Sequence, residues 1–328
     1  MRSLALLTAL CLALTLGSAV GQNLVIHANM GKTFESLQEI DGSYQQVYHL
    51  RLNGKGLLYP PKEIQEMDNL QTLSLSDNRL LTLGNALQKC SQLKVLEVDN
   101  NDLQEFPMAA LTNCTQLEEL SARGNALSQL PRALSTLKYL KVLDVGDNKL
   151  SSLDTALYLP YLHKLRVDEN LLNSVPTFVY RCRNLEYLNV YRNQIKHLDA
   201  LAPLTRLRTL NIGDNPIESL EPLSQLTQME HLTLDWIDLD SMPQQHLESL
   251  KKLRILSLEN CNLTHLPTWV TARRNLEELS LIGNHLTEVP SALFQMRRLR
   301  KLWLGKNPLP ADQVEALRMR LDHCEINF

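Results

Sequence analysis

The sequence predicts an α/β solenoid of horseshoe shape. In this fold a curved stack of short coils carries a parallel β-sheet on its concave side, irregular or 3-10 segments on its convex side, and a cap at each end. The pattern of Leu70–Leu80, leucine at positions one, four, six and eleven and Asn78 at position nine, recurs twelve times over residues 47–309, at steps of 22 to 24 residues. Its Leu-x-Leu centre alternates apolar and polar residues, as a strand with one buried face does. Because repeats of fixed period stack into one elongated unit, the length of 328 residues does not imply two domains.

The first segment, residues 1–21, has the features of a signal peptide. A positive residue precedes the apolar run Leu4–Leu16, and small residues follow it. Cleavage is expected before Gln22, with a cut after Ala19 as the alternative. The run is short for a membrane span, and a retained anchor helix is the other interpretation. We therefore expect no integral membrane span in the mature chain.

Residues 22–46 do not fit the repeat and are expected to form the N-terminal cap. Thr33 can cap a short helix that begins at Phe34. Phe34, Leu37 and Ile40 recur at helical spacing. Such a segment would cover the first coil with its apolar face.

Asparagine at the ninth position of the pattern offers one acceptor and two donors in a buried turn. It can satisfy backbone groups that successive coils would otherwise leave unpaired. Nine units carry it: Asn78, Asn101, Asn125, Asn148, Asn170, Asn193, Asn215, Asn284 and Asn307. The other three carry Lys55, Ile237 and Cys261. Since isoleucine cannot form these hydrogen bonds, we expect a local irregularity around Trp236–Leu239.

This pattern resembles that of the leucine-rich repeat family over residues 47–309, and within the family it is similar to secreted bacterial proteins. Cys261 is a familiar substitute for asparagine there, whereas Lys55 and Ile237 are departures. The resemblance implies the horseshoe fold. It also implies a closing cap over residues 310–328, for which the sequence offers a helix over Ala311–Leu321 and a last strand.

Cysteine usage leaves the redox compartment open. Cys90, Cys114 and Cys182 each lie three residues before the first leucine of a unit, a shared position that suggests packing. A disulfide between Cys90 and Cys114, on adjacent coils, is the alternative. No cysteine or histidine spacing suggests zinc, and we expect neither a metal site nor a cofactor.

The residues between the leucines are not needed for the fold, so they are where a binding site is expected. Near the middle of the array they change from small and acidic residues to tyrosine, tryptophan and arginine, the types that anchor protein interfaces. The predicted partner-binding residues are Arg166, Asp168, Tyr187, Tyr191, Arg192, Asp235, Trp236 and Trp303. The alternative is that they are ordinary solvated strand residues.

Signatures of an enzyme are missing from the sequence, which contains no G-x-S-x-G, H-E-x-x-H or phosphate-binding loop. His231 could pair with Asp235, but no serine or cysteine nucleophile is placed with them. The net charge of −3 and the lack of a basic run argue against nucleic acid as a partner.

The predicted function is therefore a non-catalytic interaction module that binds a protein or peptide on the concave face. The signal-like start favours a secreted, periplasmic or cell-surface location. The alternative is a cytoplasmic signalling scaffold, because units with Leu-Pro are similar to those of Ras-suppressor and disease-resistance leucine-rich repeat proteins. Unpaired cysteines would suit that reducing compartment.

Overall fold

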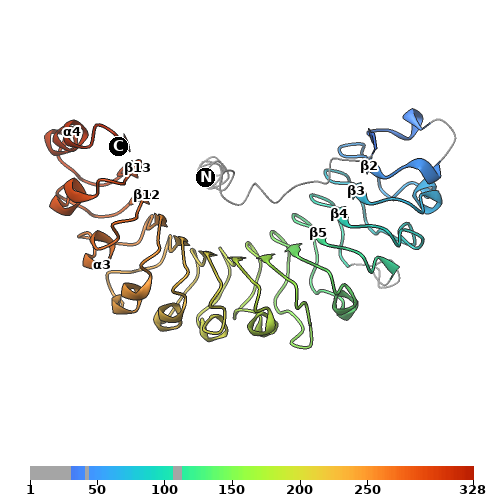
Figure 1. Ribbon diagram of the computed structural model, residues 1–328, viewed down its shortest axis with the longest axis horizontal. Helices are drawn as coiled ribbons and strands as arrows, with labels where there is room; N and C mark the ends of the chain where they lie inside the picture. The colour runs from blue at the N-terminus through green and yellow to red at the C-terminus, as the bar shows by residue number, and fades with distance from the viewer. Residues whose placement is uncertain (1–30, 41–43, 106–112) are drawn as a thin grey trace.

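The computed structural model describes residues 31–40, 44–105 and 113–328. They form an open arc in which successive coils stack side by side, from β2 near one end to β13 and α4 at the other (Figure 1). Fourteen strands form one sheet in sequence order, and all neighbouring strands are parallel. The predicted α/β solenoid is confirmed.

The strands are short because only the centre of each unit is extended, and each of the twelve central strands has a leucine as its middle residue. The fourteen strands of the sheet are β1 (Thr33–Phe34), β2 (His49–Arg51), β3 (Thr72–Ser74), β4 (Val95–Glu97), β5 (Glu119–Ser121), β6 (Val142–Asp144), β7 (Lys164–Arg166), β8 (Tyr187–Asn189), β9 (Thr209–Asn211), β10 (His231–Thr233), β11 (Ile255–Ser257), β12 (Glu278–Ser280), β13 (Lys301–Trp303) and β14 (Glu325–Asn327). The central leucines belong to β2 through β13. These leucines are at most 1 % exposed. Together with the other leucines of each unit they form one continuous core along the arc.

The convex side consists mainly of single 3-10 turns, several of which begin directly after a proline, such as Pro131 before η4 and Pro290 before η9. Proline fixes its own backbone angle and lacks an N–H, so it ends sheet pairing and starts a turn. The turns are η1 (Leu37–Glu39), η2 (Tyr44–Gln46), η3 (Lys62–Glu66), η4 (Arg132–Thr136), η5 (Thr177–Arg181), η6 (Asp199–Leu201), η7 (Glu221–Gln225), η8 (Gln245–Ser249) and η9 (Ser291–Gln295). Two α-helices are described: α3 (Thr268–Thr271) and α4 (Ala311–Arg320).

The asparagine of each unit lies in the turn after its strand and joins adjacent coils. Asn170 Nδ2 donates to the carbonyl of Val145 in the preceding coil at 3.0 Å and to Val167 and Asp168 in its own coil at 3.2 and 3.1 Å. Its Oδ1 accepts the N–H of Leu150 at 2.9 Å. The other eight asparagines donate to both coils in the same way.

At Ile237 the expected irregularity is confined to hydrogen bonding. Strand β10 pairs in register with β9 and β11, and Ile237 is 2 % exposed, so it packs in the core. The N–H of Ile217 bonds instead to Asn215 O within its own coil, and that of Leu239 bonds to Cys261 O. An apolar side chain here thus replaces polar contacts without redirecting the backbone.

The N-terminal segment differs from expectation. Thr33 and Phe34 do not start a helix but form β1, paired with His49 and Leu50 of β2. The first helical turn is η1, from Leu37. The open edge of β2 offers a row of unpaired backbone groups, and pairing with them outweighs the local capping preference of one threonine.

The two cysteines considered for a disulfide, Cys90 and Cys114, are buried thiols. Burial raises the pKa of Cys90 to about 11. The alternative of a disulfide between them is therefore not realised. The predicted signal peptide, residues 1–21, lies outside the described residues. Within the described ranges, no helix is both long and apolar enough to cross a membrane.

Candidate functional site

The side chains on the concave face come from three positions of each coil: the first and third strand residues and the residue two places further on. The last of these, the inner turn position, is followed by a residue with left-handed backbone in coil after coil, for example Asp147 (φ 49°) and Glu169 (φ 53°). Along six successive coils the inner turn position is occupied by Arg123, Gly146, Asp168, Tyr191, Gly213 and Asp235. This series is a large side chain, a glycine and an aspartate, repeated twice.

In the first triplet Arg123 crosses the intervening coil to reach Asp168. Its guanidinium donates to Asp168 Oδ2 at 2.6 Å and to Glu169 Oε1 at 3.0 Å. Gly146 makes this possible, because a Cβ there would collide with the guanidinium. Asp168 is only 3 % exposed, so the arginine supplies the countercharge that a buried carboxylate requires.

Arg166 belongs to the same charge cluster. It lies 3.4 Å from Asp144 Oδ2 and 3.8 Å from Asp168 Oδ1. Burial raises the pKa of Asp144, and the nearby Arg166 opposes that shift. Arg166 Nε and Asp168 Oδ1 are buried and have no hydrogen-bond partner. These two atoms face each other at 3.8 Å, so they form an ion pair that is too long for a hydrogen bond.

In the second triplet Tyr191 lies over Gly213. A Cβ on Gly213 would lie 3.3 Å from Tyr191 Cδ2 and 2.8 Å from the Asp235 carbonyl oxygen. Burial, followed by the charges of Asp214 and Asp235, raises the pKa of Tyr191 to about 12. The tyrosine therefore stays neutral and offers an O–H donor at physiological pH.

Asp235 is buried at the end of this triplet, where it accepts the backbone N–H of Glu259 at 2.8 Å. Burial, followed by the neighbouring charge of Glu259, raises the pKa of Asp235 to about 7. Burial also raises the pKa of Glu259. Two interacting carboxyl groups thus lie on adjacent coils, Asp235 buried and Glu259 half-buried.

Trp236 follows directly and is 57 % exposed. Its backbone is left-handed, with φ of 63°, a conformation that glycine, asparagine and aspartate adopt most readily. Since the fold would be served better by a small residue, this exposed indole is the strongest sign of a contact surface.

The remaining predicted residues are placed differently. Arg192 is exposed and lies 3.6 Å from Glu169 and 3.7 Å from Asp214. Tyr187 is only 7 % exposed and lies under the ammonium of Lys164, 5.1 Å from the ring centre. Trp303 lies on β13, three strands beyond β10, about 14 Å along the sheet. The structure therefore brings together seven of the eight predicted residues and leaves Trp303 apart.

The alternative catalytic pair is not assembled. Among the described residues no hydrogen bond or ion pair joins His231 to Asp235, and His231 Nδ1 lies 3.4 Å from Thr209 Oγ1. Burial lowers the pKa of His231. The described part of the chain also contains no group of three or more side chains placed to hold a metal ion.

Arg123, which lies at the centre of the charge cluster, is not among the residues predicted from the sequence. It stands in a unit whose other concave residues are unremarkable, and its partner Asp168 is two coils away. One feature of the sequence could have indicated this contact. Gly146 occupies the inner turn position of the coil between Arg123 and Asp168, and a glycine there leaves room for a long side chain to cross.

We name the group formed by Arg123, Arg166, Asp168, Tyr191, Arg192, Asp235 and Trp236 the central concave patch. Its half-buried Tyr191 and exposed Trp236 present aromatic surface on the concave side. Its ion pairs are half-buried, so they orient side chains more than they stabilise the fold. The arrangement is suited to binding.

Comparison with known proteins agrees with this architecture. The family profile "Leucine rich repeat" matches residues 68–127, 160–217 and 251–309. The chain is 29 % identical over 284 residues to podocan-like protein 1 of Mus musculus, covering 83 % of this chain and 49 % of that protein. It is 27 % identical over 211 residues to a flightless-1 homolog of Caenorhabditis elegans, covering 55 % and 16 %.

Among solved structures, an internalin from Listeria monocytogenes superposes with a TM-score of 0.73 at 24 % identity, covering 87 % of this chain and 81 % of that one. A complex of TLR13 with the single-stranded RNA ssRNA13 gives 0.53 at 20 % identity, covering 85 % and 53 %. Since a protein of this fold is seen with RNA, the fold does not support the exclusion of nucleic acid made from the sequence. The repeats, the sheet and the matched segments together show that this chain belongs to the leucine-rich repeat family.

Proposed function

We propose that the chain is a non-catalytic module that binds a protein or peptide through the central concave patch. The observation that carries the proposal is Trp236, a large exposed side chain held in a left-handed backbone. Tyr191, two coils before it, supplies a second aromatic surface fixed over Gly213. Aromatic and arginine side chains on a preformed surface are the usual anchors of protein interfaces.

The charge of this face points to a positively charged ligand. At the inner turn position and the residue after it, carboxylates outnumber cations over the array. The carboxylates are Asp77, Asp99, Asp147, Asp168, Glu169, Asp214, Asp235 and Glu259, and the cations are Arg123, Arg192 and Lys306. A basic peptide would approach along this gradient.

A peptide-bound relative gives a precedent for this mode. The plant receptor RGFR1, solved in complex with RGF2, superposes with a TM-score of 0.56 at 23 % identity, covering 84 % of this chain and 53 % of that one. The complex with RGF2 is a property of the plant protein, and at this identity its similarity to this chain is one of fold.

The test is selection of peptides on the immobilised wild-type protein, followed by titration of the enriched peptides. We expect net positive peptides, and at least a 10-fold loss of affinity for Tyr191→Ala/Trp236→Ala. The matched control is Tyr139→Ala/Tyr161→Ala, which removes two aromatics that are 52 % and 51 % exposed elsewhere on the molecule. Equal affinity of wild type and the patch variant would remove the patch as the site.

We further propose that the protein works outside the cytoplasm, on the basis of residues 1–21. Sequencing the N-terminus of protein isolated from its host tests this, with Gln22 as the expected first residue. The buried thiols favour the alternative of a cytoplasmic scaffold. A mature protein that begins at Met1 and fractionates with the cytosol would establish that alternative.

A further inference from the structure

The side of the arc at which the strands begin carries a second charged surface. Because the strands are parallel and in register, the residues that precede each strand line up from coil to coil on one lateral side. The strands β11, β12 and β13 begin at Ile255, Glu278 and Lys301, which pair with one another in register. Four residues before each of these lies a cation, on three consecutive coils: Lys251, Arg274 and Arg297. All three are exposed.

The next row contains Lys252, Asn275 and Arg298, and Arg300 lies further along the third coil. Arg298 Nη1 donates to Asn275 Oδ1 at 2.8 Å, and Lys252 Nζ donates to Gln228 Oε1 at 2.5 Å. An amide oxygen fixes the position of a cation without neutralising its charge. The row is therefore ordered and remains fully positive.

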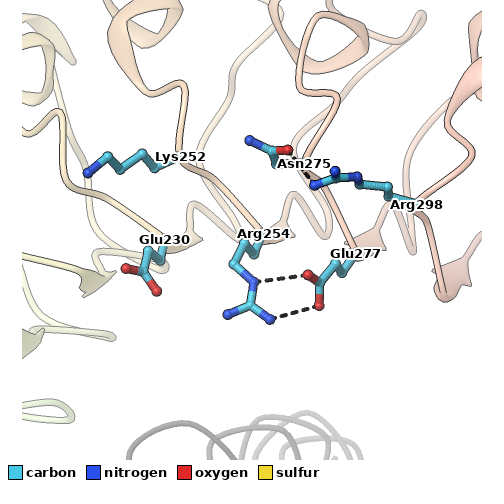
Figure 2. Close-up of a pocket in the computed structure, with 6 residues that line it drawn as sticks. All are labelled: Glu230, Lys252, Arg254, Asn275, Glu277 and Arg298. Atoms are coloured by element: carbon cyan, nitrogen blue, oxygen red, sulfur yellow. Dashed lines mark hydrogen bonds and ion pairs between the residues drawn. The ribbon is translucent and has the colours of Figure 1, made fainter.

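Figure 2 shows how these cations are separated from the paired ones. Lys252, Asn275 and Arg298 form one row, and Glu230, Arg254 and Glu277 form a second row across a shallow trough of about 320 Å³. Arg254 is held by both oxygens of Glu277 at 3.0 Å. Within the described chain, Lys251, Lys252, Arg274, Arg297, Arg298 and Arg300 form no ion pair. We call these six the lateral basic patch.

Like charges stacked about 5 Å apart on neighbouring coils oppose folding, because they repel one another. The same two rows carry single cations on the fifth, seventh and eighth coils, Lys138, Arg183 and Arg206. On the second, third and fourth coils they carry none, and the residues there are Asp68, Asn69, Ser91, Gln92, Thr115 and Gln116. The fold therefore does not require the cations of the lateral basic patch.

We propose that the lateral basic patch docks the protein onto an anionic phospholipid surface. The patch lies on a lateral side of the arc, so its rows can face a plane together. Arg298 and Arg300 lie near enough to Glu277 to lower its pKa, after the larger effect of its hydrogen bond with Arg254. Six cations without an ion pair in the described chain are still in the range that binds acidic lipid headgroups. No large exposed hydrophobic residue lies within the patch; on the same side, the exposed Tyr139 and Tyr161 lie on the fifth and sixth coils, outside it. Aromatic platforms for stacked bases are therefore missing, as are apolar side chains for insertion, which favours electrostatic adsorption to headgroups.

The test is cosedimentation of the full chain with vesicles of phosphatidylcholine alone or with 30 mol % phosphatidylglycerol (roughly the anionic fraction such assays need). We expect binding to the anionic vesicles only, weakened as salt is raised. The variant Lys251→Gln/Arg274→Gln/Arg297→Gln should partition about 100-fold less, at about fivefold per cation.

The matched control is Lys55→Gln/Arg79→Gln/Lys149→Gln, which removes the same charge from exposed residues that follow the strands, on the opposite lateral side. It should bind as wild type does. An equal loss in both variants, or equal binding to neutral vesicles, would overturn the proposal. So would binding to RNA or heparin without binding to vesicles. Peptide binding by the central concave patch should be unchanged in the lateral variant, so the two proposals fail separately.

Discussion

At the scale of single residues, the backbone of the turn that follows each strand determines which residue types fit best on that part of the concave face. Its left-handed residue is aspartate, asparagine or glycine in most coils, including Asp77, Asn100 and Gly124, because these tolerate a positive φ at least cost. Trp236 has the same left-handed backbone although a large residue is unfavourable there, and its indole is exposed. At Gly146 the missing side chain leaves room for Arg123 to cross the coil. At Gly213 it leaves room first for the backbone of Asp235 and then for the ring of Tyr191.

Replacing Trp236 should therefore separate stability from binding. We expect Trp236→Asn to raise the free energy of unfolding by about 0.5 kcal/mol, since asparagine tolerates left-handed backbone better, while affinity for selected peptides falls. Urea denaturation measures the first effect and peptide titration the second. Trp303→Asn is the control, because Trp303 is half-buried in regular strand backbone and its loss should lower stability. A destabilised Trp236→Asn would contradict the strain argument.

Gly146→Ala should break the contact between Arg123 and Asp168. The added methyl group displaces the guanidinium and leaves a buried carboxylate without its partner, which should cost about 1–3 kcal/mol. The measurement is a double-mutant cycle with Arg123→Met. In the Arg123→Met background the same alanine should cost little, because nothing crosses the coil. An equal cost in both backgrounds would show that the glycine serves the backbone alone.

At the scale of elements, a coil consists of one three-residue strand, one asparagine turn and a convex turn. None of these would be stable alone, and each is completed by its neighbours. The asparagine hydrogen bonds carry this dependence, since each of the nine asparagines donates at least one bond to the preceding coil. The coil of Ile237 shows that the array tolerates one interruption when the apolar side chain enters the core and two backbone N–H groups find carbonyl partners.

Asn170→Ala should cost about 3 kcal/mol, because it removes four hydrogen bonds and leaves buried backbone groups unsatisfied. Asn275→Ala changes the same residue type at an exposed site and should stay within about 0.5 kcal/mol. Urea unfolding followed by circular dichroism compares them. Equal stability of the two variants would mean that the ladder adds nothing to backbone packing.

At the scale of the whole molecule, charge is distributed unevenly. Carboxylates gather on the concave face, and unpaired cations gather on one lateral side near the C-terminal end. Burial raises the pKa of several concave carboxyl groups, including Asp99, Asp144 and Asp235. The net charge of −3 does not show this separation. For that reason the net charge alone argued against nucleic acid as a partner.

Stability should fall as pH rises from 6 to 8. A carboxyl group whose pKa is raised in the folded state binds a proton there that the unfolded chain has already released, so the native form loses this advantage as pH passes about 7 for Asp235. Thermal unfolding at both pH values tests this. Asp235→Asn keeps an acceptor for Glu259 N–H and should flatten the dependence, whereas Asp238→Asn, at an exposed site, should not. An unchanged slope in Asp235→Asn would assign the effect to other groups.

The sequence by itself determined the fold, because the spacing of Leu70, Leu73, Leu75 and Asn78 is a local period that stacking merely repeats. It also predicted candidate contact residues in the middle units, where tyrosine, tryptophan and arginine cluster. Only the tertiary structure decided which of them are available: Tyr187 is covered and Trp236 is exposed. It brought Arg123 to Asp168 and left Lys251, Arg274 and Arg297 without an ion pair in the described chain, because contacts between coils join residues 20 to 46 positions apart. The repeat period sets which residues align across coils, but not which of their side chains meet.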